Sequence, residues 1–287
     1  MSAGLAQRLS RREFVITSEL VPPRGAGADA VRRAVSELAF ADGLNVTDLP
    51  RARPRMSALA AAAVAVSEGA ETILQMTCRD RNRLALAADA LGAAALGVAA
   101  ILPLYGDPLP DDVPAAAVND IDAAGLVQLL VNLTRGLLPD GSLTDGAAPT
   151  LAIGAAASPG FTTVESLMAK VDAGATFVQT QIVLDVDRFG EWLDALRDSG
   201  VLGRVALLPS VVVPSSAEFV ERVRGFGAQV APEIEARAAR GEGEAAAREV
   251  VARLLTMPEV SGLHVLPIGS SPAAAAALAS FARRVVG

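Results

Sequence analysis

The sequence predicts a single (β/α)8 barrel that spans residues 1–287. Short apolar runs, many of them rich in β-branched residues, alternate with longer Ala-, Leu- and Arg-rich segments of helical period. The alternation occurs eight times, and the short runs are apolar almost throughout, as are strands of a parallel sheet covered by helices. Eight repeats favour a closed barrel over an open, doubly wound sheet. No linker divides the chain into independent halves.

Each element can be placed in chain order. The predicted strands cover residues 14–20, 43–48, 71–77, 98–106, 150–156, 177–183, 204–212 and 262–268. The predicted helices cover residues 28–39, 57–68, 80–96, 122–135, 163–173, 186–199, 216–226, 243–255 and 272–286. Capping chemistry supports these boundaries: Asp80 is expected as an N-cap, and Thr163 and Ser216 each open a helix with a glutamate close behind.

The charge balance argues against two classes of partner. Lys and Arg number 25 against 32 Asp and Glu, which gives a formal net charge of −7. Nucleic-acid binding and attachment to anionic membranes both require clustered cations. The sequence shows no secretory signal and no apolar stretch long enough to span a membrane. We therefore expect a cytoplasmic protein without nucleic-acid or membrane partners.

One cysteine and one histidine limit the chemistry. Cys78 alone cannot form an internal disulfide framework or a Cys-based zinc site, and His264 alone cannot form a multi-His centre, so no metal is predicted. His264 lies inside a predicted strand, where we interpret it as a structural imidazole whose hydrogen bonds are satisfied. Catalysis is then expected from carboxylates, amides, backbone groups and a bound cofactor.

Polar residues occur where the predicted strands end. Glu19, Thr47, Gln75 and Gln181 lie near the carboxyl ends of their strands, and Asp107 directly follows another strand. In a (β/α)8 barrel these ends form one rim, which holds the active site. A carboxyl group there can have its pKa raised by desolvation and can then donate a proton. We expect the side chains of Glu19, Asp107 and Gln181 to converge at this rim.

Several motifs at the strand ends carry a resemblance. They are Ser18-Glu19-Leu20-Val21-Pro22-Pro23, Thr77-Cys78-Arg79-Asp80-Arg81-Asn82-Arg83, Gly106-Asp107, and Lys170-Val171-Asp172-Ala173-Gly174-Ala175 followed by Gln179-Thr180-Gln181. Through them, in order and at barrel spacing from about Phe14 to about Ser280, the chain resembles the methylenetetrahydrofolate reductase family. It is more similar to the short bacterial branch, which lacks a regulatory domain. From the residues alone, the run 79–83 is either a phosphate-binding cluster or a solvated helix start.

The resemblance implies an oxidoreductase of one-carbon metabolism and methionine biosynthesis. In that family a flavin, usually FAD, lies across the strand ends of the barrel and is reduced by NADH or NADPH. The folate substrate, 5,10-methylenetetrahydrofolate, then receives a hydride at its methylene carbon and becomes 5-methyltetrahydrofolate.

The resemblance also assigns roles to residues. Glu19 matches the family's general acid, and Asp107 matches a carboxylate near the flavin and the pterin that tunes the flavin and helps hold the folate. Gln181 matches a glutamine that contacts the pterin. Thr47 and Lys170 match positions that contact the flavin and its phosphates.

The chain also departs from the family's pattern. Gln75 stands at a flavin-side position where relatives often carry His, Tyr105 stands where they carry Arg or Thr, and no aromatic residue occurs near Ile121. FMN in place of FAD, or hydride transfer from the nicotinamide without any flavin, therefore stays open.

Other functions stay open as well. One is a non-catalytic barrel that binds folate or a partner subunit within a one-carbon complex, and another is a reductase of a different cyclic aminal or imine. The sequence does not decide between NADH and NADPH, or whether the chain forms a homo-oligomer or requires a second subunit.

Overall fold

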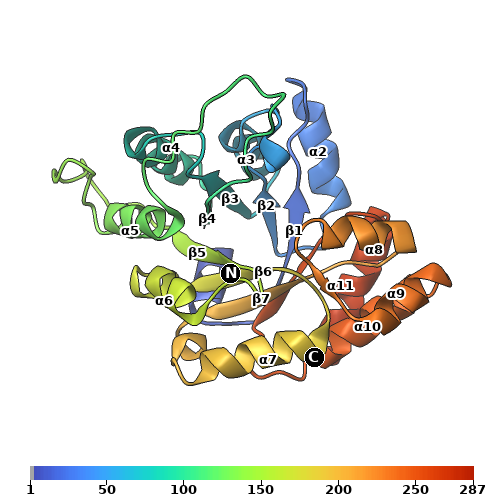
Figure 1. The fold of residues 1–287 in the computed structure, drawn as a ribbon. Coiled ribbons are helices and arrows are strands. Elements are labelled where there is room, and N and C mark those ends of the chain that lie inside the picture. Colours follow the sequence, from blue (N-terminus) through green and yellow to red (C-terminus); the bar gives the residue numbers. More distant parts are fainter. Residues whose placement is uncertain (1–2) are drawn as a thin grey trace.

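The protein, described by a computed structural model over residues 3–287, folds into the predicted closed parallel barrel (Figure 1). The barrel strands are β1 (Val15–Leu20), β2 (Gly43–Val46), β3 (Thr72–Thr77), β4 (Ala100–Leu104), β5 (Ala152–Ala157), β6 (Phe177–Leu184), β7 (Ala206–Val211) and β9 (Gly262–Val265). They pair in parallel in chain order, β9 pairs with β1, and the β5–β6 pairing completes the ring. All eight predicted strands are confirmed, with ends that differ by a few residues.

Helices surround the barrel (Figure 1). They are α2 (Ala28–Glu37), α3 (Ala58–Ser67), α4 (Arg83–Ala95), α5 (Ala123–Thr134), α6 (Val164–Asp172), α7 (Val186–Arg197), α8 (Ala217–Arg224), α10 (Gly243–Leu254) and α11 (Pro272–Val286). Thr163 and Ser216 cap α6 and α8 as predicted, each accepting a backbone N–H with its side chain. None of the helices formed by residues 3–287 is both long and apolar enough to cross a membrane.

The Asp80 cap is a prediction that the structure corrects. Helix α4 begins three residues later than predicted, and Asn82 is its N-cap, accepting from the Ala85 N–H. The Asp80 carboxylate instead accepts from two nitrogens of the adjacent Arg79 guanidinium, Nε at 2.8 Å and Nη2 at 2.6 Å. A charged bidentate partner therefore replaces the helix terminus as the ligand of this carboxylate.

Several short elements were not predicted from the sequence. They are α1 (Leu5–Ser10), α9 (Pro232–Ala239), the two-residue strand β8 (Gln229–Val230) and the 3-10 turns η1 (Pro50–Ala52) and η2 (Val201–Arg204). Strand β8 pairs with the end of β6, outside the ring of eight strands.

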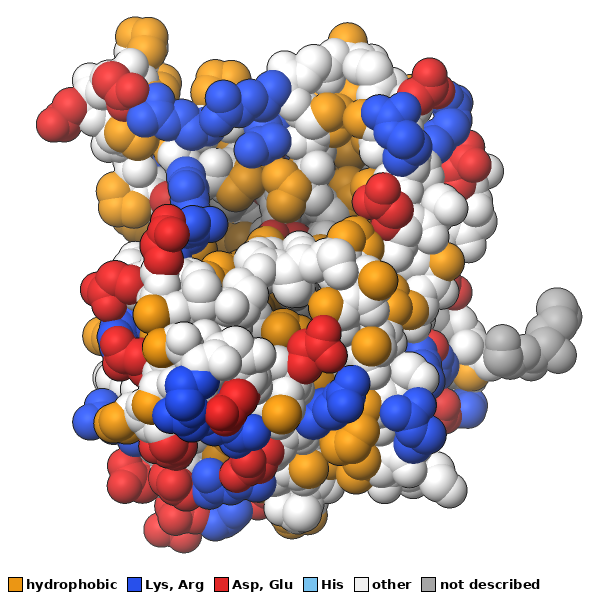
Figure 2. All heavy atoms as spheres, turned by 90° about the vertical axis from the view of Figure 1, so that its right-hand side faces the viewer, with side chains coloured by type: hydrophobic (Ala, Val, Ile, Leu, Met, Phe, Trp, Pro, Cys, Tyr) orange, Lys and Arg blue, Asp and Glu red, His pale blue; other side chains and the backbone are white. Residues whose placement is uncertain are grey.

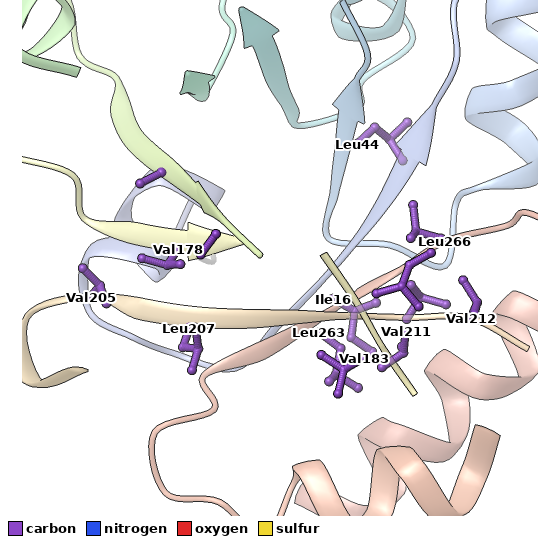
Figure 3. Packing of buried hydrophobic residues seen from close by; sticks show 14 of the residues in the cluster. Ile16, Leu44, Val178, Val183, Val205, Leu207, Val211, Val212, Leu263 and Leu266 are labelled. Carbon is purple, nitrogen blue, oxygen red and sulfur yellow. The ribbon is translucent and has the colours of Figure 1, made fainter. Parts of the chain in front are cut away.

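Two layers of apolar packing hold the barrel. The larger layer lies between the strands and the surrounding helices and includes Ile16, Leu207 and Leu263 (Figure 3). The smaller layer fills the barrel, where Leu9 of α1 packs with Phe177. A Cβ at position 154 would lie 2.4 Å from the Phe177 ring, so glycine there makes room for the ring. The layer that includes Leu9 and Phe177 closes the barrel interior and leaves the carboxyl rim for a site.

Candidate active site

The predicted site residues gather at one rim. Because every barrel strand is parallel, Glu19 on β1, Gln75 on β3 and Gln181 on β6 all lie toward the same end of the barrel. Thr47 directly follows β2, and Asp107 lies three residues beyond the end of β4, at that end. The predicted residues therefore share one end of the barrel, and their convergence on one substrate stays a prediction. Figure 2 shows a hollow in one face of the molecule, with basic side chains gathered along its upper left side.

Glu19 has the most perturbed carboxyl group at the rim. Its side chain is half-buried and accepts no hydrogen bond from the residues that the structure describes. Desolvation by the surrounding protein raises the pKa of Glu19 to about 7. A carboxylic acid with this pKa carries its proton over much of the neutral range, so Glu19 can serve as a proton donor.

The raised pKa of Glu19 implies that the free energy of unfolding depends on pH. The pKa of Glu19 is higher in the folded chain, about 7 against a usual 4.5, so folding favours its protonated form. The stabilisation is complete below the unfolded pKa and is lost as the pH rises through 7. Between about pH 5 and about pH 8 the wild type should therefore lose about 2 kcal/mol of unfolding free energy, whereas Glu19→Gln, which does not titrate at this position, should not. Urea denaturation at both pH values measures the difference, and a constant difference would contradict the raised pKa.

Buried amide and hydroxyl groups line the rim beside Glu19. Asn45, the Cα partner of Glu19 across the β1–β2 pair, donates from Nδ2 to Gln179 Oε1 at 2.7 Å. Asn45 Oδ1 and Thr47 Oγ1 are buried and have no hydrogen-bond partner among residues 3–287. Buried polar atoms are normally paired, so two unpaired oxygens on neighbouring positions of one strand end suit a polar ligand. Asn45 was not predicted as a site residue, although strand positions two apart, such as 45 and 47, point to the same face of a sheet.

Gln75 and Lys170 complete the polar groups expected to contact a cofactor. The Gln75 side chain is half-buried on β3, and residues 3–287 give it no hydrogen-bond partner. Lys170 reaches from α6 to the end of β5 and donates from Nζ to the Ala156 carbonyl at 2.8 Å. Desolvation lowers the pKa of Lys170 and the Asp122 carboxylate opposes this shift, so a cation lies half-buried beside the rim.

Asp107 is exposed and holds the loop that follows β2. Its Oδ2 accepts the backbone N–H of Arg51 at 2.6 Å. Gly106 has φ of +99°, and a Cβ there would approach Arg79 Cβ to 3.0 Å, so glycine is required to place Asp107. The Asp107 carboxylate therefore already has a hydrogen-bond partner within the protein, the Arg51 N–H.

Gln181 is held by the backbone of neighbouring segments. Its Nε2 donates to the Phe226 carbonyl at 2.9 Å, and its Oε1 accepts the Ile182 N–H at 2.9 Å. The pairing of β6 with β7 shifts register between Gln179 and Ile182. This irregularity separates the environments of Gln179, which bonds Asn45, and Gln181, which bonds the loop after α8.

The arginines of the run 79–83 bind other groups of the protein. Arg79 is 3% exposed, binds Asp80, and donates to the carbonyls of Asp107 at 2.9 Å and Leu49 at 3.4 Å. Arg81 pairs with Asp48 and Asp89. Arg79 is therefore part of neither a solvated helix start nor an open phosphate site, because its donors are occupied by the protein.

The prediction that the hydrogen bonds of His264 are satisfied holds for only one of its two ring nitrogens. Its Nδ1 lies 2.8 Å from Thr17 Oγ1, whereas its Nε2 is buried without a partner among residues 3–287. Burial lowers the pKa of His264 to about 3, so the imidazole is neutral. Within residues 3–287 no group of three or more His, Cys, Asp or Glu side chains is placed to hold a metal ion.

Comparisons with known proteins agree with this fold. The family described as methylenetetrahydrofolate reductase matches residues 4–280. No curated protein sequence matches the chain significantly. An uncharacterized Clostridium thermocellum protein that binds two copies of 5-methyl-5,6,7,8-tetrahydrofolic acid superposes with a TM-score of 0.71, 12% identity and coverage of 98% of this chain and 99% of that one. Tryptophan synthase of Mycobacterium tuberculosis superposes with a TM-score of 0.53, 12% identity and 99% coverage of both. Both structures establish the fold alone.

Proposed function

The chain belongs to the methylenetetrahydrofolate reductase family, and from that premise we propose that it reduces 5,10-methylenetetrahydrofolate to 5-methyltetrahydrofolate with NADH or NADPH. The observation that carries the proposal is Glu19, a carboxylic acid with a pKa of about 7 at the barrel rim. The unpaired oxygens of Asn45 and Thr47 lie on the neighbouring strand end and support a polar ligand there.

Glu19 supplies the proton in this reaction. As the aminal C–N bond of the five-membered ring breaks, its electron pair stays on nitrogen, which takes the proton from Glu19. The methylene carbon is left as an iminium, which accepts a hydride to form the methyl group. The half-buried position of Glu19 lets solvent return the proton after each turnover. Gln181 on β6 and Asp107 after β4 would bind the hydrogen-bonding edge of the pterin.

The residues present fit a flavin. The buried oxygens of Thr47 and Asn45 have no partner among residues 3–287, and Lys170 keeps a half-buried cation for a phosphate. Thr47, Gln75, Asp107 and Lys170 would hold the cofactor. A bound FAD or FMN would supply the hydride chemistry between nicotinamide and folate.

Purified protein should oxidise NADH or NADPH in the presence of 5,10-methylenetetrahydrofolate, at a rate far above that without folate. The absorbance spectrum of the fresh protein, and assays with and without added FAD or FMN, test the cofactor. Activity from a colourless protein without added flavin would contradict the flavin cofactor but support the proposed reaction. Absence of folate-dependent turnover under every condition would contradict the reaction.

A second candidate is a folate-binding barrel without catalysis. The folate bound by the Clostridium thermocellum protein favours it. Titration of 5-methyltetrahydrofolate separates the candidates, since a binder gives saturable binding without turnover in the assay above.

A further inference from the structure

A chain of contacts crosses the barrel mouth. Arg51 follows β2, and its guanidinium carbon lies 4.7 Å from the centroid of the Phe226 ring. Phe226 follows α8, and its carbonyl accepts from Gln181 on β6. Strands β2 and β6 are four positions apart in the ring of eight, on opposite sides of the barrel. The contact between Arg51 and Phe226 therefore links elements from opposite sides of the barrel.

The backbone that carries Arg51 is strained. Leu49, Arg51 and Ala52 have φ of 45°, 58° and 53°, in the left-handed region that L-residues seldom adopt. Such a conformation is unfavourable for a residue with a Cβ and persists only where its surroundings determine it. The Asp107 carboxylate binds the Arg51 N–H, and the buried Arg79 binds the Leu49 carbonyl. Protein contacts thus hold Arg51 in a position that its own backbone disfavours.

Arg51 also keeps its charge available. Four arginines of the rim loops are paired with carboxylates: Arg53 with Asp112, Arg79 with Asp80, Arg81 with Asp48, and Arg83 with Asp120. Arg55 has no carboxylate partner among residues 3–287, but it is partly buried and donates to the Pro22 carbonyl. Arg51 is exposed, and no carboxylate among residues 3–287 lies within ion-pair distance of its guanidinium. The chain carries a net charge of −7, so an unneutralised cation at the mouth offsets the repulsion that an anionic ligand would meet.

We propose that Arg51 binds an anionic group of the substrate at the mouth, an inference that rests on the proposed function. Both reactants supply one: the glutamyl tail of folate ends in carboxylates, and the dinucleotide carries phosphates. The guanidinium lies over the Phe226 ring, and its N–H groups donate no hydrogen bond within residues 3–287, so they are free for bidentate binding of carboxylate or phosphate. Phe226 holds the side chain, and the free N–H groups bind the ligand.

The test compares Arg51→Gln and Arg51→Lys with the wild type in steady-state kinetics. Arg51→Gln should raise one KM about tenfold or more, with a smaller change in kcat, because a charge-assisted hydrogen bond is lost. Arg51→Lys should recover part of the loss, since it keeps the charge without the bidentate edge. A rise confined to the KM of folate assigns the tail carboxylates, and a rise confined to that of NAD(P)H assigns a phosphate. Unchanged values of both overturn the proposal.

Arg53→Gln is the matched control, because Arg53 lies in the same loop but is already paired with Asp112. It should leave both KM values within about twofold. Titration of 5-methyltetrahydrofolate into the wild type separates two kinds of failure. Wild-type protein that neither binds folate nor turns over overturns the proposed function and this inference together. Wild-type turnover with an Arg51→Gln variant of unchanged KM overturns the Arg51 role alone.

Discussion

Glu19→Gln is expected to lower kcat for methylenetetrahydrofolate reduction by about 100-fold or more, the range lost with a general acid. Glutamine keeps the size of the side chain but cannot release a proton to the ring nitrogen. Oxidation of NAD(P)H with an artificial electron acceptor needs no such proton and should continue near the wild-type rate. Steady-state assays of the two reactions on one preparation measure the contrast.

The pH dependence gives an independent check on the acid role. Because Glu19 donates only while protonated, wild-type folate reduction should fall as the pH rises through its pKa of about 7. Glu19→Asp, which keeps a proton donor on a shorter stem, should retain activity between that of the wild type and Glu19→Gln. Equal loss of folate reduction and acceptor reduction in Glu19→Gln would refute the acid role.

The barrel could be predicted because its pattern is local. Each strand is a short apolar run and each helix an amphipathic segment, and their eightfold alternation specifies the topology. Helix α1 was missed for a tertiary reason: Leu5 and Leu9 are buried only because they cover the end of the barrel. Capping chemistry could not choose between Asp80 and Asn82, because the choice depends on whether Arg79 takes the carboxylate.

The residues that lie at the rim could also be predicted in part. Parallel strands bring Glu19, Thr47 and Gln75 to one end whatever the loops do. The contact between Arg51 and Phe226 could not be predicted, since it joins two loops remote in sequence through left-handed backbone at residues other than glycine. Nothing in a propensity scale favours that conformation at Leu49 or Ala52. The roles given to Glu19, Thr47, Gln75, Asp107, Lys170 and Gln181 stay predictions for the experiments described.

Arg79→Met is expected to lower the free energy of unfolding by about 3 kcal/mol, because it removes a buried guanidinium that is paired with the partly exposed Asp80 carboxylate and binds two backbone carbonyls. Arg79 is 3% exposed, and its loss removes the ion-pair partner of Asp80 and one donor each from the Leu49 and Asp107 carbonyls. The Asp80 carboxylate keeps the Thr77 hydroxyl, and the Leu49 carbonyl keeps the Ala52 N–H. Urea denaturation followed by the fluorescence of Trp192, the single tryptophan, measures the change.

Two further variants identify what the Arg79 guanidinium contributes. Arg83→Met removes a more exposed arginine of the same run, paired with Asp120, and should cost less than about 1 kcal/mol. In the double variant Arg79→Met with Asp80→Asn, no charge is left unpaired, so most of the stability should return. The loop 49–52 would still lack its buried anchor, and the KM that depends on Arg51 should stay raised although the chain folds. Full recovery of stability and KM together would mean that Arg79 serves only to neutralise Asp80, and that Asp107 alone holds the strained loop.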